Sequence, residues 1–172
     1  MTMIVRGLSI AVVLFTAACG QQTATKPAPI PPCSNNIRVI PGQVEGAAGH
    51  RFLVLVFNNV GTKTCRMVGY PTVDLVDRSG HLVQHVRHTL RGQAGLPQSV
   101  TKPTPVTLRG GKSASAVVEA SAIPKGAGAS CTDHLLMVTP PGQHRAVPAG
   151  TAMLPTCNAQ VHPVVAGDAR TR

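Results

Sequence analysis

The sequence predicts an all-β fold, an immunoglobulin-like antiparallel β-sandwich with two disulfides, for residues 33–165. Short apolar runs rich in β-branched residues recur between turn signals made of Gly, Pro, Asn and Ser, and many short strands of this kind favour a sandwich. No long segment shows the 3.6-residue apolar period of an amphipathic helix. The chain also lacks Trp, which argues against a true immunoglobulin domain but not against the general architecture.

The first half of the domain has the clearest strand pattern. Residues 37–40 predict a short opening strand, and the apolar run Arg51–Phe57 predicts a central strand that is covered on both faces. A turn signal with two Asn residues and a Gly ends this run. Gly69-Tyr70-Pro71 then separates two further strands, which we expect at residues 65–68 and 72–77.

Turn and loop signals divide the second half. Arg78-Ser79-Gly80 leads into a strand expected at residues 81–88, and the Gly and Pro content of residues 91–105 predicts a loop. The strand expected at 106–108 precedes a Gly-Gly turn. Residues 113–120 follow as a strand, although their alanines also permit a helix. The remaining expected strands are residues 135–139, 145–147 and 161–165.

The N-terminus has the pattern of a lipoprotein signal peptide. Arg6 ends a weakly basic region, an apolar stretch follows, and Ala17-Ala18-Cys19 places small residues before a cysteine. The apolar stretch spans about ten residues, whereas a transmembrane helix needs roughly twenty. We therefore predict cleavage after residue 18 and acylation of Cys19. The alternative is an ordinary secretory signal, which would export the protein without a lipid.

These signals divide the chain into four parts. Residues 1–18 are the expected signal peptide, 19–32 a lipidated proline-rich tether, 33–165 the sandwich and 166–172 a C-terminal tail. In a polyproline conformation the tether would extend about 3 Å per residue and would hold the domain some tens of Å from the bilayer. Two or more acyl chains, such as palmitate, anchor a protein stably. The predicted location is therefore the extracytoplasmic face of a bacterial cell membrane.

Four cysteines remain once Cys19 is assigned to the lipid. An even number in an exported chain indicates two disulfides, and four cysteines allow three pairings. We favour Cys33–Cys65 and Cys131–Cys157 because each joins neighbours in the sequence. Loops of that size would stabilise the fold by roughly 3–4 kcal/mol each in the chain-entropy account. A four-cysteine zinc site is the alternative, but the chain has no C-x-x-C spacing.

The chain is strongly basic, with 16 Lys and Arg against 6 Asp and Glu. Export argues against a nucleic-acid partner. The expected partners are the membrane, through the N-terminal lipid, and an anionic envelope polymer or another envelope protein. The basic residues are scattered through the sequence, so the simpler interpretation is that the charge confers solubility.

The longest irregular segment, residues 87–104, is the predicted recognition surface, because loops on rigid sandwiches often carry binding. Arg87, Arg91 and Lys102 would form its basic lip. A solvated loop without a ligand is the alternative.

Metal binding is the second functional hypothesis, with copper or zinc as the ion. On a strand, His81 and His85 share one face, about 13 Å apart, and His88 points to the other face. This spacing is too wide for one ion. Met67, Met137 and Met153 lie apart from the histidines in the sequence and are expected in the core. We predict no metal site and no cofactor.

An enzyme is the third hypothesis and the weakest. Arg109-Gly-Gly-Lys-Ser113 resembles the end of a phosphate loop, but Val106 replaces the earlier glycine and a strand follows where a helix is needed. Asp133 and His134 are neighbours, yet no G-x-S-x-G element is present. We therefore predict a non-catalytic binding or structural module without catalytic residues.

Several segments together resemble one known family. They are Cys33, the run 49–55 with Asn58 after it, 65–73 with its C-x-x-x-G-Y-P element, 75–80, 108–116, Cys131, Pro140-Pro141-Gly142 and Cys157. The family is domain of unknown function 4232, found in actinobacterial lipoproteins and other exported proteins. The resemblance covers residues 33–165 and implies an exported β-sandwich with two disulfides. It implies no activity and no catalytic residues.

Overall fold

The protein is all-β over the residues that a computed structural model describes, 28–126, 129–167 and 169. The predicted signal peptide, Cys19 and most of the predicted tether lie outside these residues. The strands are β1 Ile37–Ala47, β2 His50–Asn59, β3 Cys65–Met67, β4 Thr72–Val76, β5 Leu82–His85, β6 Arg87–His88, β7 Val106–Leu108, β8 Ser113–Ser121, β9 Asp133–Thr139, β10 Val147–Pro155, β11 Gln160–Val161 and β12 Val165–Ala166. The described residues include no helix with the length and hydropathy needed to cross a bilayer.

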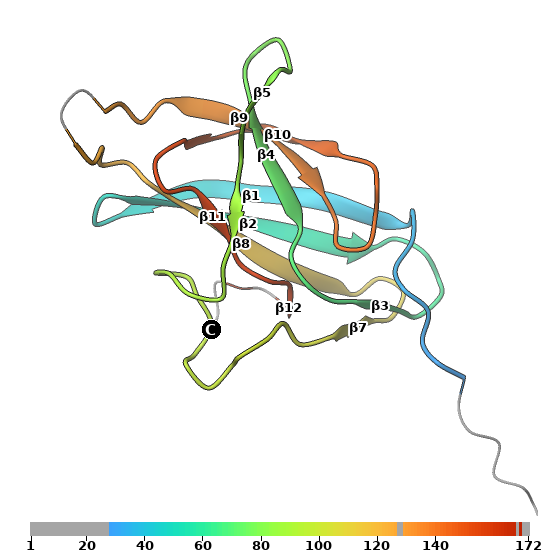
Figure 1. The fold of residues 1–172 in the computed structure, drawn as a ribbon. Helices are drawn as coiled ribbons and strands as arrows, with labels where there is room; N and C mark the ends of the chain where they lie inside the picture. The colour runs from blue at the N-terminus through green and yellow to red at the C-terminus, as the bar shows by residue number, and fades with distance from the viewer. Residues whose placement is uncertain (1–27, 127–128, 168, 170–172) are drawn as a thin grey trace, which may run out of the picture.

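The strands form two main sheets and one small one (Figure 1). The first sheet has the order β1-β2-β8-β11-β6, with β12 also paired to β8. The second has the order β10-β9-β4-β5, and β3 pairs with β7 in a two-stranded sheet. The pairs are antiparallel except β11 with β6, which is parallel. The predicted all-β antiparallel class is therefore confirmed. The finer immunoglobulin-like assignment stays a prediction.

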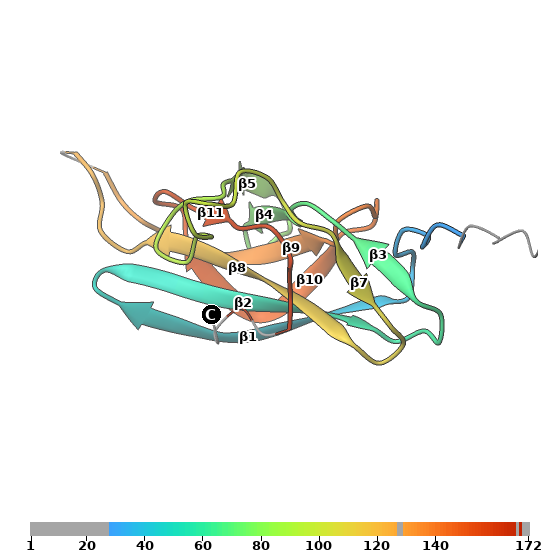
Figure 2. The same cartoon turned by 90° about the horizontal axis from the view of Figure 1, so that it is seen from below.

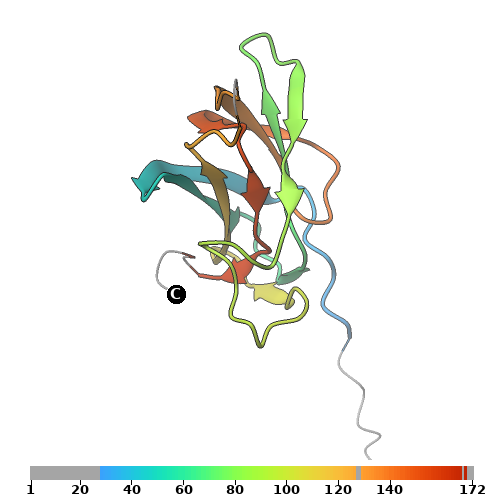
Figure 3. The same cartoon turned by 60° about the vertical axis from the view of Figure 1, so that its left-hand side comes forward.

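The hydrophobic core lies between the two main sheets, which face each other in Figures 1 and 3. Alternation in β2 sends Leu53, Leu55 and Phe57 into this core, and each of them is fully buried. Val73 of β4 and Leu136 of β9 belong to the same cluster from the second sheet. Aliphatic side chains therefore fill most of the interior, as the scarcity of aromatic residues requires.

Both predicted disulfides are present. Cys33–Cys65 joins the start of the domain to β3, and Cys131–Cys157 joins the segment before β9 to the segment after β10. Each bridge closes a loop between sequence neighbours, with separations of 32 and 26 residues. The pairing favoured from the sequence is confirmed.

The single strand expected at residues 81–88 is wrong, because the chain changes sheets within it. β5 pairs with β4 in the second sheet, whereas β6 pairs with β11 in the first. Val86 lies between them, is buried, and donates its amide to the carbonyl of Val73 at 2.9 Å. The buried Val86 thus marks the crossing point, and the alternation of the sequence does not reveal it.

Edge strands account for most of the remaining differences. β10 runs through Pro155, well past the strand expected at residues 145–147, although it contains Pro148 and Gly150. It lies at the edge of the second sheet, where a missing amide donor is tolerated, and its register shifts after Pro148. β1 is likewise an edge strand and continues to Ala47 past an irregularity after Pro41. Ala166, which the sequence assigns to the C-terminal tail, instead belongs to β12 and pairs with Ala114 of β8.

Candidate functional site

A buried carboxylate, Glu119, is the centre of the candidate site. Alternation along β8 places Ala116, Val118 and Ala120 in the core, so that Val117 and Glu119 lie on the opposite face of the first sheet. Glu119 is nevertheless only 2% exposed. A buried charge of this kind is costly unless hydrogen bonds and opposite charge compensate it.

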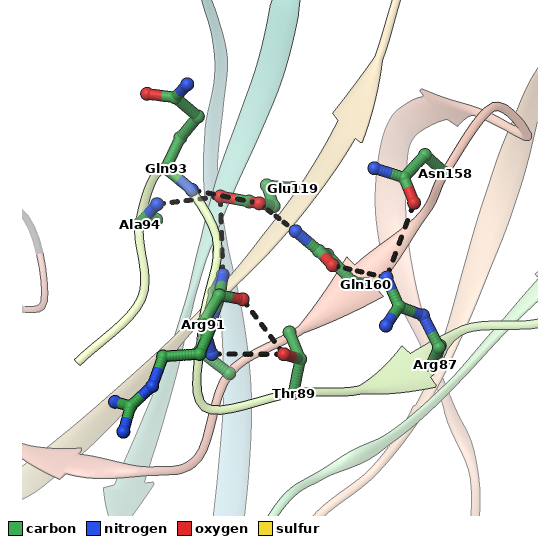
Figure 4. Close-up of polar contacts among 9 residues, drawn as sticks. Arg87, Thr89, Arg91, Gln93, Ala94, Glu119, Asn158 and Gln160 are labelled. Carbon is green, nitrogen blue, oxygen red and sulfur yellow. Dashed lines mark hydrogen bonds and ion pairs between the residues drawn. The ribbon is translucent and has the colours of Figure 1, made fainter. Parts of the chain in front are cut away.

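Three donors meet the Glu119 carboxylate (Figure 4). The backbone amides of Gln93 and Ala94 donate to it at 3.1 and 2.7 Å, and the side-chain amide of Gln160 donates to Oε1. Gln93 and Ala94 belong to the long loop between β6 and β7, whereas Gln160 lies on β11. Glu119 therefore ties an irregular surface loop to the sheet.

The imidazole of His162 lies next to the same carboxylate. Its Nε2 lies 3.3 Å from Oε2 of Glu119, and both side chains are 2% exposed. This distance suits an ion pair, but the two groups are not aligned as a hydrogen bond, and neither ring nitrogen of His162 has a hydrogen-bond partner among the described residues. We therefore interpret the contact as electrostatic, with Gln93, Ala94 and Gln160 supplying the directed bonds.

The environment of Glu119 lowers its pKa to about 2 from an ordinary value of 4.5. Burial by itself raises this pKa, because it disfavours the charged form. The adjacent His162 and the hydrogen bonds from Ala94 and Gln160 lower the pKa by more than burial raises it. Glu119 is therefore ionised at neutral pH.

Gly92 permits the close approach between the loop and Glu119. Its φ of 142° lies in a region that L side chains rarely adopt. A Cβ atom at this position would overlap Oε1 of Glu119 and the side-chain nitrogen of Gln160. Only glycine fits between the loop backbone and the buried carboxylate without displacing them.

Arg91, a predicted binding residue, is bonded within its own loop. Its Nη1 donates to the carbonyls of Leu96 and Pro97 at 3.1 and 2.9 Å. Its Nη2 donates to the carbonyls of Gln98 and Val100 at 3.2 and 2.8 Å. The guanidinium group thus closes the loop upon itself, in the way that its planar fork allows.

The other two predicted binding residues have different surroundings. Arg87 donates through Nη2 to Gln160 at 2.7 Å and to Asn158 at 3.3 Å, so that Gln160 links it to Glu119 (Figure 4). Lys102 is exposed and takes no part in this network. The structure therefore brings Arg87 and the backbone of the loop that contains Arg91 close to Glu119. Lys102 lies apart from this site. Their role in binding stays a prediction.

A cavity of about 470 Å³ lies beneath the same loop. Leu96 and Pro97 line it from the loop, and Val117, His162 and Val165 line it from the first sheet and the segment that follows β11. Its surface is mostly apolar, with the Glu119 network behind one wall. Such a cavity suits a small apolar group or an inserted side chain.

The predicted histidine group is divided between separate partners. Nδ1 of His81 lies 3.3 Å from Asp77, and Nδ1 of His85 lies 2.7 Å from Asp74. His88 stacks on Tyr70 with ring centres 4.7 Å apart. No group of three or more potential metal ligands occurs among the described residues. Copper or zinc binding stays the alternative hypothesis, and the described residues offer no cluster of ligands for it.

The methionines named in that prediction occupy two environments. Met67 is 1% exposed and belongs to the core. Met137 and Met153 are half-buried on β9 and β10.

Sequence reasoning missed Glu119, Gln160 and His162. The only local signal is a lone carboxylate among the small and apolar residues of β8. Its hydrogen-bond donors lie 25 to 41 positions away in the sequence, so no motif connects them.

Comparison with known proteins gives one match. The family described as Domain of unknown function (DUF4232) matches residues 33–166, which is most of the chain. No curated protein and no solved structure matches this chain.

Proposed function

The chain belongs to the DUF4232 family, and on that premise we propose that it is a lipid-anchored module on the extracytoplasmic face of a bacterial membrane that binds a partner without catalysis. The partner would be an anionic envelope polymer or another envelope protein. The residues between Thr89 and Pro105, which we call the clamped loop, would provide the recognition surface.

The cell-envelope location is supported by two features of the chain. One is the signal pattern that ends at Cys19. The other is the pair of disulfides, because such bonds form and persist in oxidising compartments.

One observation supports the binding role, the set of hydrogen bonds that ties the clamped loop to itself and to the sheet. Arg91 bonds four carbonyls of the loop, and Glu119 bonds two of its amides from the sheet below. A loop that is ordered before binding loses less conformational entropy when it meets a partner. Burying the Glu119 carboxylate costs free energy, and this cost is understandable if the clamped loop needs a defined shape in order to bind its partner.

The charges at the site support binding better than catalysis. With a pKa of about 2, Glu119 is a poor proton acceptor at neutral pH, where a general base needs a pKa near the working pH. Arg87 and Arg91 are both engaged in hydrogen bonds that hold the loop and its neighbouring strands. We therefore assign these side chains a positioning role.

The test is capture on intact cells with a photo-reactive residue in place of Gln98, which is exposed on the clamped loop. A matched probe replaces Arg78, an exposed residue in the turn between β4 and β5. We expect one dominant cross-linked species from position 98, none from position 78, and loss of that species in the Glu119→Gln variant. Equal capture from both positions would contradict a binding role for the loop.

A further inference from the structure

Four basic residues that are scattered in the sequence gather at one end of the domain. Lys63 lies in the connection between β2 and β3, Arg66 on β3, and Arg109 and Lys112 in the turn between β7 and β8. Pairing of β3 with β7 places Arg66 opposite Thr107, next to this turn. We call Lys63, Arg66, Arg109 and Lys112 the basic end.

Asn59 holds the two connections of the basic end together. Its backbone amide donates to the carbonyl of Lys112 at 3.0 Å, and its side-chain amide donates to the carbonyl of Lys63 at 2.9 Å. The carbonyl of Asn59 in turn accepts from the amide of Gly111 at 2.8 Å. The two loops are therefore fixed against each other by a buried residue, and their lysines share one end of the molecule.

The N-terminal segment enters the domain at this same end. The amide of Arg66 donates to the carbonyl of Pro31 at 2.8 Å, and the amide of Cys33 donates to the carbonyl of Arg66 at 2.9 Å. The Cys33–Cys65 disulfide fixes the junction. Figures 1 and 2 show the entering chain beside β3 and β7. The polypeptide that leads back to Cys19 therefore leaves from the basic end.

The charged side chains of the basic end are exposed, and within the described part of the chain no carboxylate pairs with them. All four side chains belong to exposed residues, and none has a carboxylate within ion-pair distance among the described residues. The described acidic residues lie elsewhere in the fold. They are Glu45 near the far end of β1, Asp74 on β4, Asp77 after β4, Glu119 near the end of β8 and Asp133 at the start of β9.

The separation is large on the scale of electrostatic screening. Glu45 lies roughly 25 Å along β1 from Ile37, which begins the strand next to the entering chain, at about 3.3 Å per residue. The Debye length at physiological salt is about 8 Å. The four cations of the basic end therefore have no ion-pair partner among the residues that the structure describes. Val60 adds an apolar side chain to the same connection as Lys63 and is 52% exposed.

We propose that the basic end docks on the headgroups of an anionic phospholipid membrane, and this inference rests on the proposed anchoring through Cys19. Charge complementarity and the exit of the anchored segment both select the membrane as the occupant. The tether alone, at about 3 Å per residue, would allow the domain to stand tens of Å from the bilayer. Docking would instead hold the domain against the bilayer in one orientation.

The expected strength follows from the charge. Each Lys or Arg close to an anionic surface increases binding about fivefold, so the loss of three of them lowers it on the order of a hundredfold. Exposed charges are screened, so binding must also weaken steeply as salt is raised.

The experiment uses residues 19–172 with Cys19→Ser, so that no lipid contributes to binding. Sedimentation is measured with vesicles of phosphatidylcholine containing one third phosphatidylglycerol and with vesicles of phosphatidylcholine alone. The test variant is Lys63→Gln/Arg109→Gln/Lys112→Gln. The control is Arg51→Gln/Arg78→Gln/Lys125→Gln, which removes the same charge from exposed positions away from the basic end. Circular dichroism verifies that both variants fold.

We expect salt-sensitive binding of the parent protein and the control to anionic vesicles, and a loss on the order of a hundredfold in the test variant. Equal losses in both variants would overturn the proposal, because net charge alone would then explain binding. Absence of binding by the parent protein at low salt, or binding that salt does not weaken, would also overturn it. Mass spectrometry of Cys19 tests the lipid anchor separately. The vesicle experiment does not depend on its result, because the protein used there carries no lipid.

Discussion

The carboxylate of Glu119 accepts a 2.7 Å hydrogen bond from the backbone amide of Ala94, a residue 25 positions earlier in the sequence. This bond joins the clamped loop to the central strand of the first sheet. Since the neighbouring amide of Gln93 donates to the same carboxylate, one buried anion fixes two consecutive residues of the loop. The loop's shape therefore depends on a charge that faces away from the core.

The Glu119→Gln variant should be less stable by about 3 kcal/mol, because it removes a charged acceptor and leaves buried amides with a weaker partner. Urea unfolding measures the change. The matched control is Asp133→Asn, at an exposed position, where we expect a change within about 0.5 kcal/mol. Equal stabilities of the two variants would show that Glu119 does not hold the loop.

The pH dependence of stability follows from the same residue. Because folding lowers the pKa of Glu119 from 4.5 to about 2, its contribution is fully present above pH 4.5 and is lost as the pH falls toward 2. Asp77, whose pKa is also lowered by hydrogen bonds from the backbone of His81 and Ser79, changes stability in the same direction. Thermal unfolding of the wild type, Asp77→Asn and Glu119→Gln between pH 6 and 2 separates the contribution of Glu119 from that of Asp77. Stability should depend less on pH in Glu119→Gln than in Asp77→Asn. The same pH dependence in both variants would contradict the assignment of the larger contribution to Glu119.

Gly92 should not tolerate a side chain. Gly92→Ala places a Cβ atom against Glu119 and Gln160 and requires a positive φ, so we expect both a loss of stability and an opened loop. Hydrogen exchange of the Gln93 and Ala94 amides measures the opening. Gly80→Ala is the control, since its φ is also positive, at 83°, but no atom of the described residues lies within 4 Å of the added Cβ. Slow exchange at residues 93 and 94 in Gly92→Ala would contradict the close fit.

Much of the fold can be predicted from local pattern. The apolar run Arg51–Phe57 predicts β2 as a central strand, and β2 does lie between β1 and β8. The cysteine pairing also follows from sequence neighbours. The break at Val86 could not be predicted, because it depends on which sheet accepts each half of the segment. Local alternation carries no information about this choice.

The site was less accessible to sequence reasoning. Loop composition correctly identified the irregular segment. Arg87 is linked to Glu119 through Gln160, whereas Arg91 bonds carbonyls within the loop itself. Their positive charge suggested a surface for anions, whereas the structure uses both guanidinium groups in internal hydrogen bonds. The donors to Glu119 come from the loop and β11, and only the folded topology brings them together.

Arg91→Lys should loosen the clamped loop while leaving the sandwich intact. A lysine ammonium cannot reproduce the forked donation to four carbonyls, so the hydrogen-bonded amides of Leu96 and Val100 should exchange hydrogen faster. We expect a stability loss of about 1–2 kcal/mol. Arg78→Lys, in an exposed turn, is the control and should leave exchange unchanged. Unchanged exchange of the Leu96 and Val100 amides in Arg91→Lys would mean that the loop is ordered by other contacts.

Mass spectrometry of the protein isolated from its own cell membranes tests the anchored-module account most directly. The account predicts an N-terminus at Cys19 that carries a diacylglyceryl group, together with two intact disulfides. A chain that starts at Met1 or Met3, with free thiols at Cys33, Cys65, Cys131 and Cys157, would contradict the anchor, the compartment and the partner class together.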